Sequence, residues 1–373
     1  MSPSNPPVST SPIDSLGKRL GQTWAAIQKA QVKSLDVQKK IRNALTHPAP
    51  IFSSSDLSLV VFGSIARLEC TEGSDVDWTL LIDGQVDPKH NATSLEIKRA
   101  IDKVLKKLKL KEPATGGAFG GKAFSHDIIH HIGGDRDSNR NMTQRILLLL
   151  ESAPVRLRSN QDSKGDEAYD RVLKAILQKY LQADSGFFAK GKESHVPRFL
   201  LNDIVRFWRT MCVDFAWKGW EQGEVKWALR NIKLRFSRKL IFFSGLLLVF
   251  SCYKNKTLAF RERDERINAC LGHLESLVRM KPLDIVCSVL LDYNHTSDRK
   301  VAEILNRYDR FLSILNKESE RKRFEGMGPQ KAYKDRTFQR IRKQSHEFQD
   351  VISEISFSDR SKLGRFIRQY GVF

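Results

Sequence analysis

The pattern of apolar and polar positions changes along the chain near residue 155. Between residues 51 and 155, short apolar runs bounded by Gly, Ser and Asp predict buried β-strands, clearest at 57–64 and 75–84. Beyond this point apolar residues recur every three or four positions, which predicts helices almost throughout. We therefore expect an α+β fold, in which a small mixed β-sheet with flanking helices precedes an all-helical domain.

Breaks in this pattern suggest four segments. We expect an N-terminal tail and helix over residues 1–50, with residues 1–12 disordered, and the sheet-bearing domain over 51–155. A helical domain then covers 156–316 and a basic helical tail covers 317–373. Within the sheet-bearing domain we expect a helix at 92–107, a third strand at 108–112 and a glycine-rich loop at 115–121. That loop either covers a substrate or is a plain connection.

The longest apolar segment, Leu240 to Tyr253, is too short to cross a bilayer comfortably. We expect it to form a buried core helix, and we expect no membrane partner.

Candidate chemistry is concentrated in the two clearest strands. Gly63 and Ser64 follow the first apolar run, and Asp75 and Asp77 open the second. Side chains alternate along a strand, so the two aspartates are expected to point the same way. Two adjacent carboxylates repel each other, and a divalent cation such as Mg²⁺ between them relieves that repulsion. The glycine permits close backbone approach, and the serine offers a hydroxyl to a phosphate oxygen.

The segments 63–69 and 74–77 together resemble the signature of polymerase-β-like nucleotidyltransferases, in particular minimal nucleotidyltransferases and bacterial uridylyltransferase and adenylyltransferase regulators. The resemblance covers roughly residues 56 to 150. It implies that Asp75 and Asp77 are metal ligands and catalytic, that Gly63 and Ser64 hold a donor nucleoside triphosphate such as ATP, and that the cofactor is Mg²⁺ or Mn²⁺. Arg67 in the intervening turn is expected to help neutralise the phosphates.

Members of this family usually have a third acidic residue on a neighbouring strand. Glu112, at the end of the strand expected at 108–112, is the preferred candidate, and Asp127 is the alternative. Position 68 is Leu, whereas many relatives have a Gly between the Arg and the Glu of this turn.

The helical domain contains candidate phosphate contacts. Residues 226–239 interleave basic and apolar side chains and lead directly into the apolar helix. In this class of enzyme a helical domain closes the nucleotide cleft, so Arg230 and Lys233 are candidate phosphate contacts. Alternatively, they pair with local acids or lie on a solvated face.

Histidines 126 and 130 are spaced as in zinc-protease helices. The expected helix is short, its acid is Asp127 rather than Glu, and no third ligand stands out nearby. Surface or substrate-facing histidines are therefore preferred to a zinc site.

Overall composition narrows the class of partner. The 373 residues carry a formal charge of +20, which attracts polyanions such as nucleic acid or nucleotides. In the tail, spaced aromatic residues among the bases are consistent either with RNA binding or with docking onto the protein's own surface. The five cysteines are scattered and odd in number, which favours a reduced, cytoplasmic protein.

The sequence thus predicts a metal-dependent transferase that moves a nucleoside monophosphate from a nucleoside triphosphate to an acceptor hydroxyl and releases pyrophosphate. The acceptor is RNA, a protein side chain or another nucleotide, because relatives of the motif use all three. The alternative is a non-catalytic nucleotide- or RNA-binding regulatory module on the same fold.

Overall fold

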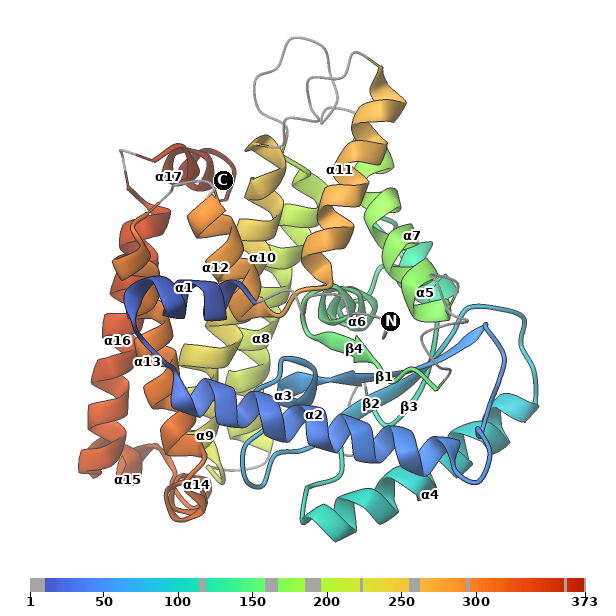
Figure 1. Ribbon diagram of the computed structural model, residues 1–373, viewed down its shortest axis with the longest axis horizontal. Helices are drawn as coiled ribbons and strands as arrows, with labels where there is room; N and C mark the ends of the chain where they lie inside the picture. The colour runs from blue at the N-terminus through green and yellow to red at the C-terminus, as the bar shows by residue number, and fades with distance from the viewer. Residues whose placement is uncertain are drawn as a thin grey trace, which may run out of the picture.

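In the computed structural model, a small sheet lies beside a larger assembly of helices (Figure 1). The structure describes residues 11–113, 119–157, 167–184, 196–221, 224–254, 262–292, 296–358 and 361–371. The disorder predicted for residues 1–12 therefore falls almost wholly outside the described residues, as does most of the predicted glycine-rich loop.

The sheet has four strands in the order β3-β2-β1-β4. Its central strand β1 pairs antiparallel with both β2 and β4, and β2 pairs parallel with β3. Phe62 at the end of β1 lies opposite Asp77 on one side and Ser152 on the other. The expected mixed α and β architecture is confirmed. The strands are β1 (Leu57–Phe62), β2 (Asp77–Ile82), β3 (Gly121–Phe124) and β4 (Ser152–Pro154).

The strand predicted at 108–112 is wrong. Leu108 ends helix α4 (Lys89–Leu108), and Lys109 adopts a left-handed conformation with φ of 53°. After that turn only Lys111 pairs with the sheet region, in an isolated bridge to Asp75. The helical pattern of α4 extends through Leu108 and leaves too few residues for a strand, so β3 forms later in the chain.

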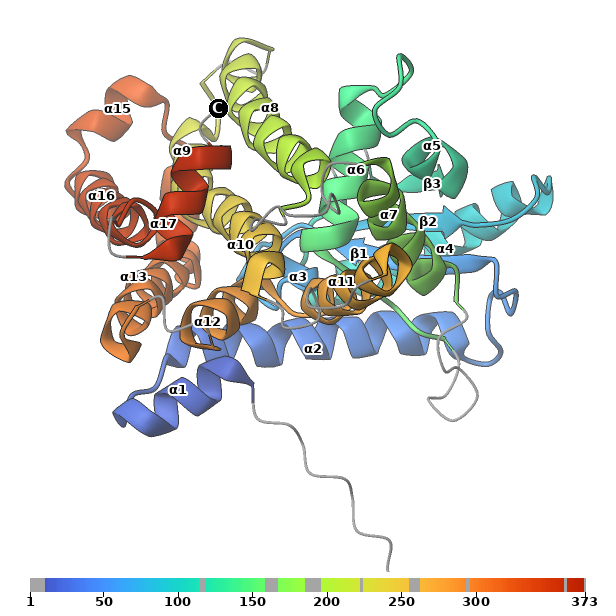
Figure 2. The same ribbon diagram turned by 90° about the horizontal axis from the view of Figure 1, so that it is seen from above.

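Alternate residues of β1 enter two different cores, as the twofold period of a strand requires. Leu59 and Val61 pack with α2 (Ala25–Thr46) and α4 on one face of the sheet. Val60 and Phe62 pack into the larger core on the other face, where α5, α6 and α7 lie (Figure 2). These three helices are α5 (Ser125–Ile129), α6 (Asn139–Leu150) and α7 (Ala168–Ala183).

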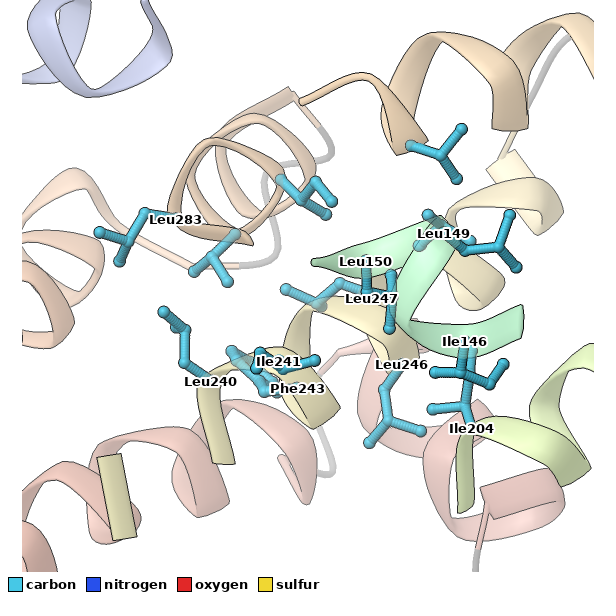
Figure 3. Packing of buried hydrophobic residues seen from close by; sticks show 14 of the residues in the cluster. Ile146, Leu149, Leu150, Ile204, Leu240, Ile241, Phe243, Leu246, Leu247 and Leu283 are labelled. Carbon is cyan, nitrogen blue, oxygen red and sulfur yellow. The ribbon is translucent and has the colours of Figure 1, made fainter. Parts of the chain in front are cut away.

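Helix α10 (Lys239–Ser251) runs through this larger core, and the prediction of a buried helix at 240–253 is confirmed. In Figure 3 its Leu246 and Leu247 lie among leucine and isoleucine side chains from neighbouring helices. A Cβ at Gly245 would approach Leu150 Cδ1 to 2.9 Å, so this position needs glycine for close helix packing. None of the helices within the described residues is both long and apolar enough to span a membrane.

The C-terminal tail is helical, as predicted, and packs on the rest of the chain. Its helix α16 lies against α13, and three of its aromatic residues, Phe324, Phe338 and Phe348, are fully buried. These three side chains form core and cannot stack on nucleic-acid bases. The remaining helices are α1 (Pro12–Leu20), α3 (Gly63–Ala66), α8 (Arg198–Glu221), α9 (Trp227–Lys233), the π-helix η1 (Leu234–Arg238), η2 (Cys252–Lys254), α11 (Arg263–Val278), α12 (Pro282–Asp292), α13 (Asp298–Leu315), α14 (Glu318–Glu325), α15 (Pro329–Lys334), α16 (Arg336–Ser356), α17 (Lys362–Phe366) and η4 (Ile367–Gly371).

Candidate functional site

The turn after β1 lies close to carboxylates from two separate parts of the chain. Gly63 follows β1 and has a φ of 70°, a conformation that favours glycine. A Cβ built on it would lie 3.3 Å from Oδ2 of Asp77 and 3.7 Å from Oε1 of Glu151. Because Gly63 has no side chain, carboxylates from both neighbouring strands can approach the same turn.

Asp75 and Asp77 line one cavity with Ser64, as the alternation along the strand predicts. Burial and the negative charge of Asp75 raise the pKa of Asp77 to about 7, and Glu151 adds to this effect. Burial also opposes ionisation of Asp75, but the combined effect of Lys233, a backbone hydrogen bond, Arg321 and Arg238 outweighs it and lowers the pKa of Asp75. The two aspartates together therefore hold about half a proton at pH 7, and close to one proton between about pH 5 and 6.

Glu151 supplies a third carboxylate near the Gly63 turn, which the sequence analysis did not identify. It lies between α6 and β4, and its side chain is only 2% exposed. Arg67 Nη1 lies 2.7 Å from its Oε1, and Arg238 Nη1 donates to both carboxylate oxygens, at 3.0 and 2.9 Å. No local sequence pattern marked Glu151, because its place beside Gly63 depends on the pairing of β4 with β1.

Neither sequence candidate for the third carboxylate lines the cavity. Glu112 has a side chain that is 52% exposed, and its nearest cation is Lys98 at 3.8 Å. Asp127 is exposed on α5. Glu112 was chosen because a strand was expected to present it. The chain instead makes a turn and a single bridge at Lys111, which leaves Glu112 outside the site.

Arg67 has a different environment from the one expected. It is buried, donates from Nε to Glu69 at 2.8 Å and pairs with Glu151. Despite the opposing effect of burial, these carboxylates raise the pKa of Arg67. Its charge holds two protein carboxylates in place, rather than standing free for a phosphate. Next to it, Leu68 has a φ of 61°, the left-handed conformation for which a Gly would be the usual choice.

Positive charges from the helical part cover the carboxylates. Lys233, Arg238 and Arg321 line the same cavity as Asp75 and Asp77. Burial lowers the pKa of Lys233, against the raising effect of Asp75. Arg321, on α14, also donates to Oγ1 of Thr71 at 3.0 Å and so ties the tail to the sheet region.

Only one of the two cations predicted to contact phosphate lies in this cavity. Lys233 lies beside Asp75, whereas Arg230 is outside and donates to the backbone carbonyl of Val225. The π-turn η1 explains which residues face inward. Its hydrogen bonds join residues five apart, so Lys233 and Arg238 fall on nearly the same side of the helix.

The polar atoms of the cavity fit a divalent cation with phosphate oxygens. Oγ of Ser64 is buried and has no hydrogen-bond partner among the described residues. The raised pKa of Asp77 marks a negative charge that lacks full compensation. The cavity is small, at about 50 Å³, whereas pockets for whole organic ligands are typically about 300–1,000 Å³. Ions and phosphate oxygens fit this closed form, and a nucleoside fits only if the helices move.

Across the described ranges, no group of three or more His, Cys, Asp and Glu side chains is arranged to hold a metal ion, and this includes the carboxylates near Gly63. His126 and His130 stack with ring centroids 4.7 Å apart on the short helix α5. Both side chains are exposed, as expected for surface histidines.

Comparisons with known proteins do not add a family assignment. No family model matches the chain, and no curated protein matches it.

Proposed function

We propose that this protein is a metal-dependent nucleotidyltransferase, which transfers a nucleoside monophosphate from a nucleoside triphosphate to an acceptor hydroxyl and releases pyrophosphate. One observation carries the proposal: the carboxylates of Asp75, Asp77 and Glu151 gather around the turn at Gly63, beneath cationic side chains from the helical part. Negative charge at the base of a cavity with positive charge above it suits a metal–triphosphate complex.

Asp75 and Asp77 are the metal ligands in this proposal. A bound Mg²⁺ or Mn²⁺ would supply charge neutralisation and activation of the acceptor hydroxyl. Glu151 acts as a positioning residue, because Arg67 and Arg238 already occupy its oxygens. Its charge helps to keep the pKa of Asp77 high in the metal-free protein. A cation at the aspartate pair would then displace a proton.

The remaining polar groups bind the triphosphate. Ser64 donates its hydroxyl to a phosphate oxygen, and Lys233 and Arg321 offset the phosphate charge. In the closed form, Lys233 instead compensates Asp75. Triphosphate binding therefore requires the helices that carry these cations to move away from the sheet and to close again over the phosphates.

A second candidate function is a non-catalytic nucleotide-binding module. The observation that favours it is the close compensation of the carboxylates by protein cations, which leaves a cavity of only about 50 Å³. Such a module would bind nucleotide without breaking the bond between the α and β phosphates.

Pyrophosphate release distinguishes the two functions. The protein is incubated with each nucleoside triphosphate, Mg²⁺ or Mn²⁺, and mixed candidate acceptors, while melting temperature and pyrophosphate are measured. We expect both stabilisation and pyrophosphate release in the wild type, with release reduced at least about 100-fold in Asp77→Asn. Asp36→Asn removes a carboxylate from an exposed pair with Lys40 and should leave release unchanged. Stabilisation without release from any nucleotide would instead support the non-catalytic module.

A further inference from the structure

A second group of cations lies on another side of the helix that carries Lys233 and Arg238. We name Arg235, Lys239 and Arg342 the cation strip. Arg235 lies on η1, Lys239 begins α10 and Arg342 lies on α16. In Figure 2, α9 and α10 lie between α8 and α16, and η1 joins them and contacts both flanking helices.

The cation strip lacks anionic partners within the chain. Among the described residues, none of its three members forms an ion pair with a carboxylate. Arg235 instead donates to two neutral groups, Oδ1 of Asn231 at 2.8 Å and Oγ of Ser345 at 3.5 Å. Nε of Arg342 is buried and has no hydrogen-bond partner in the described part of the chain.

The three cations also repel one another. Burial and the neighbouring Arg342 lower the pKa of Arg235. Burial and Arg235 lower the pKa of Lys239 to about 8, although Asp350 acts in the opposite direction. Half-buried cations that repel each other cost stability unless a ligand compensates them. A bound polyanion would reduce the repulsion between the cations and would supply the missing hydrogen bonds.

Aromatic side chains adjoin the cation strip. The guanidinium of Arg342 lies 5.2 Å from the ring centre of Tyr333, which is 44% exposed. The ring of Tyr333 is 5.6 Å from that of Trp227, and Trp227 is 6.1 Å from Phe215 on α8. Cations beside partly exposed rings are the combination that holds unpaired nucleotides, through phosphate contacts and base stacking.

We infer that the cation strip and its adjoining aromatic residues bind a single-stranded nucleic acid, which is the acceptor of the transfer reaction. The role of this nucleic acid as acceptor rests on the proposed function, whereas its binding rests on the cation strip alone. Arg238, which lines the cavity and contacts Glu151, is adjacent in sequence to Lys239 in the strip. A strand on the strip therefore lies about one helix diameter, roughly 10 Å, from the carboxylates.

Fluorescence anisotropy with a labelled 12-nucleotide single strand tests the inference, in the absence of metal and nucleoside triphosphate. We expect Arg235→Gln/Arg342→Gln to weaken binding at least about tenfold and to reduce the salt dependence. Tyr333→Ala, which changes no charge at an exposed position, should weaken binding severalfold through lost stacking. The melting temperature of each variant is measured alongside, and Tyr333→Ala keeps the test valid if the arginine pair destabilises the fold.

The matched control removes two charges elsewhere. Lys103→Gln/Lys107→Gln changes exposed lysines on α4, beside an open basic groove on the far side of the sheet from α5, α6 and α7. Its affinity should stay within about twofold of the wild type. An equal or greater loss in this control would overturn the inference, because binding would then follow net charge alone. Unchanged affinity in both strip variants would overturn it as well.

Further measurements distinguish RNA from DNA as the ligand, and separate this inference from the proposed function. Tighter binding of RNA than of DNA of the same sequence supports an RNA acceptor, and equal binding supports single strands of either kind. Equal or tighter binding of a duplex contradicts the inference. Asp75→Asn/Asp77→Asn should still bind the single strand, so the strip's binding can be confirmed even if no nucleotide is transferred. If the strip variants transfer the nucleotide to an acceptor as efficiently as the wild type does, this inference is contradicted and the proposed function is not.

Discussion

Asp77 is the residue at which the electrostatics of the site can be tested most directly. It opens β2 opposite Phe62, and its carboxylate lies near those of Asp75 and Glu151. Burial and these like charges raise its pKa from an ordinary carboxyl value to about 7. An aspartate with a purely structural role would gain nothing from this unfavourable burial of its charge. A metal ligand would recover the lost free energy when the ion binds.

The raised pKa of Asp77 predicts a specific pH dependence. In the metal-free protein the folded state keeps a proton on Asp77 between about pH 4 and 7, whereas the unfolded state releases it. The stability contributed by this group is therefore present at low pH and is lost as pH rises through 7. Asp77→Asn cannot lose a proton, so its melting temperature should exceed that of the wild type by several degrees at pH 8 and match it near pH 4.

The control for this prediction is Asp36→Asn, whose exposed carboxylate pairs with Lys40 on α2. The melting temperature of Asp36→Asn should not rise relative to that of the wild type as pH increases from about 4 to 8. Saturating Mg²⁺ should narrow the gap at pH 8, because the ion replaces the proton. A constant difference between Asp77→Asn and the wild type across this pH range would contradict the assigned electrostatics.

At the scale of elements, the π-turn η1 determines which cations cover the carboxylates. Its wider hydrogen-bond spacing brings Lys233 and Arg238 to the cavity and leaves Arg235 on another side, near Ser345. Regular helical spacing would not place residues five apart on one face. One turn of irregular helix thus places Arg238 at the cavity and Arg235 in the cation strip.

This arrangement predicts different effects for two cations of one short helix. Lys233→Gln removes the charge beside Asp75 and should weaken nucleoside triphosphate binding by roughly tenfold, a typical value for one charged contact. Arg230→Gln is the matched control, because Arg230 lies outside the cavity and contacts the Val225 carbonyl. Equilibrium titration with a fluorescent nucleotide and Mg²⁺ measures both. Equal losses in the two variants would show that general charge, not the cavity, governs binding.

The sequence predicted the elements around the site better than the site itself. Strands at 57–62 and 77–82 and the buried helix α10 follow from local apolar patterns, and so does the shared side of Asp75 and Asp77. The third carboxylate depends on strand pairing over a long sequence separation, which no local pattern reveals. Glu151 comes close to Gly63 only because β4 pairs with β1, with Ser152 opposite Phe62.

At the scale of the whole molecule, the cavity is completed by segments far apart in sequence. Thr71 near the sheet receives a hydrogen bond from Arg321 on α14, and Lys111 beside Asp75 pairs with Glu325 at 2.8 Å. The sequence predicted the tail as basic helices, but not that one of its arginines reaches the carboxylates. The basic side chains behind the formal charge of +20 include those that line the cavity and those of the cation strip.

The most direct test of the proposed site is the initial rate at which label from α-labelled nucleoside triphosphate enters acceptor, compared between two glutamate variants. Glu151→Gln and Glu112→Gln make the same chemical change, one at a buried position beside the Gly63 turn and one at an exposed position. We predict a loss of at least about 100-fold for Glu151→Gln, with the folded fraction confirmed by circular dichroism, and a rate within about twofold of the wild type for Glu112→Gln. A wild-type rate in Glu151→Gln, or the larger loss in Glu112→Gln, would contradict the assignment of the site.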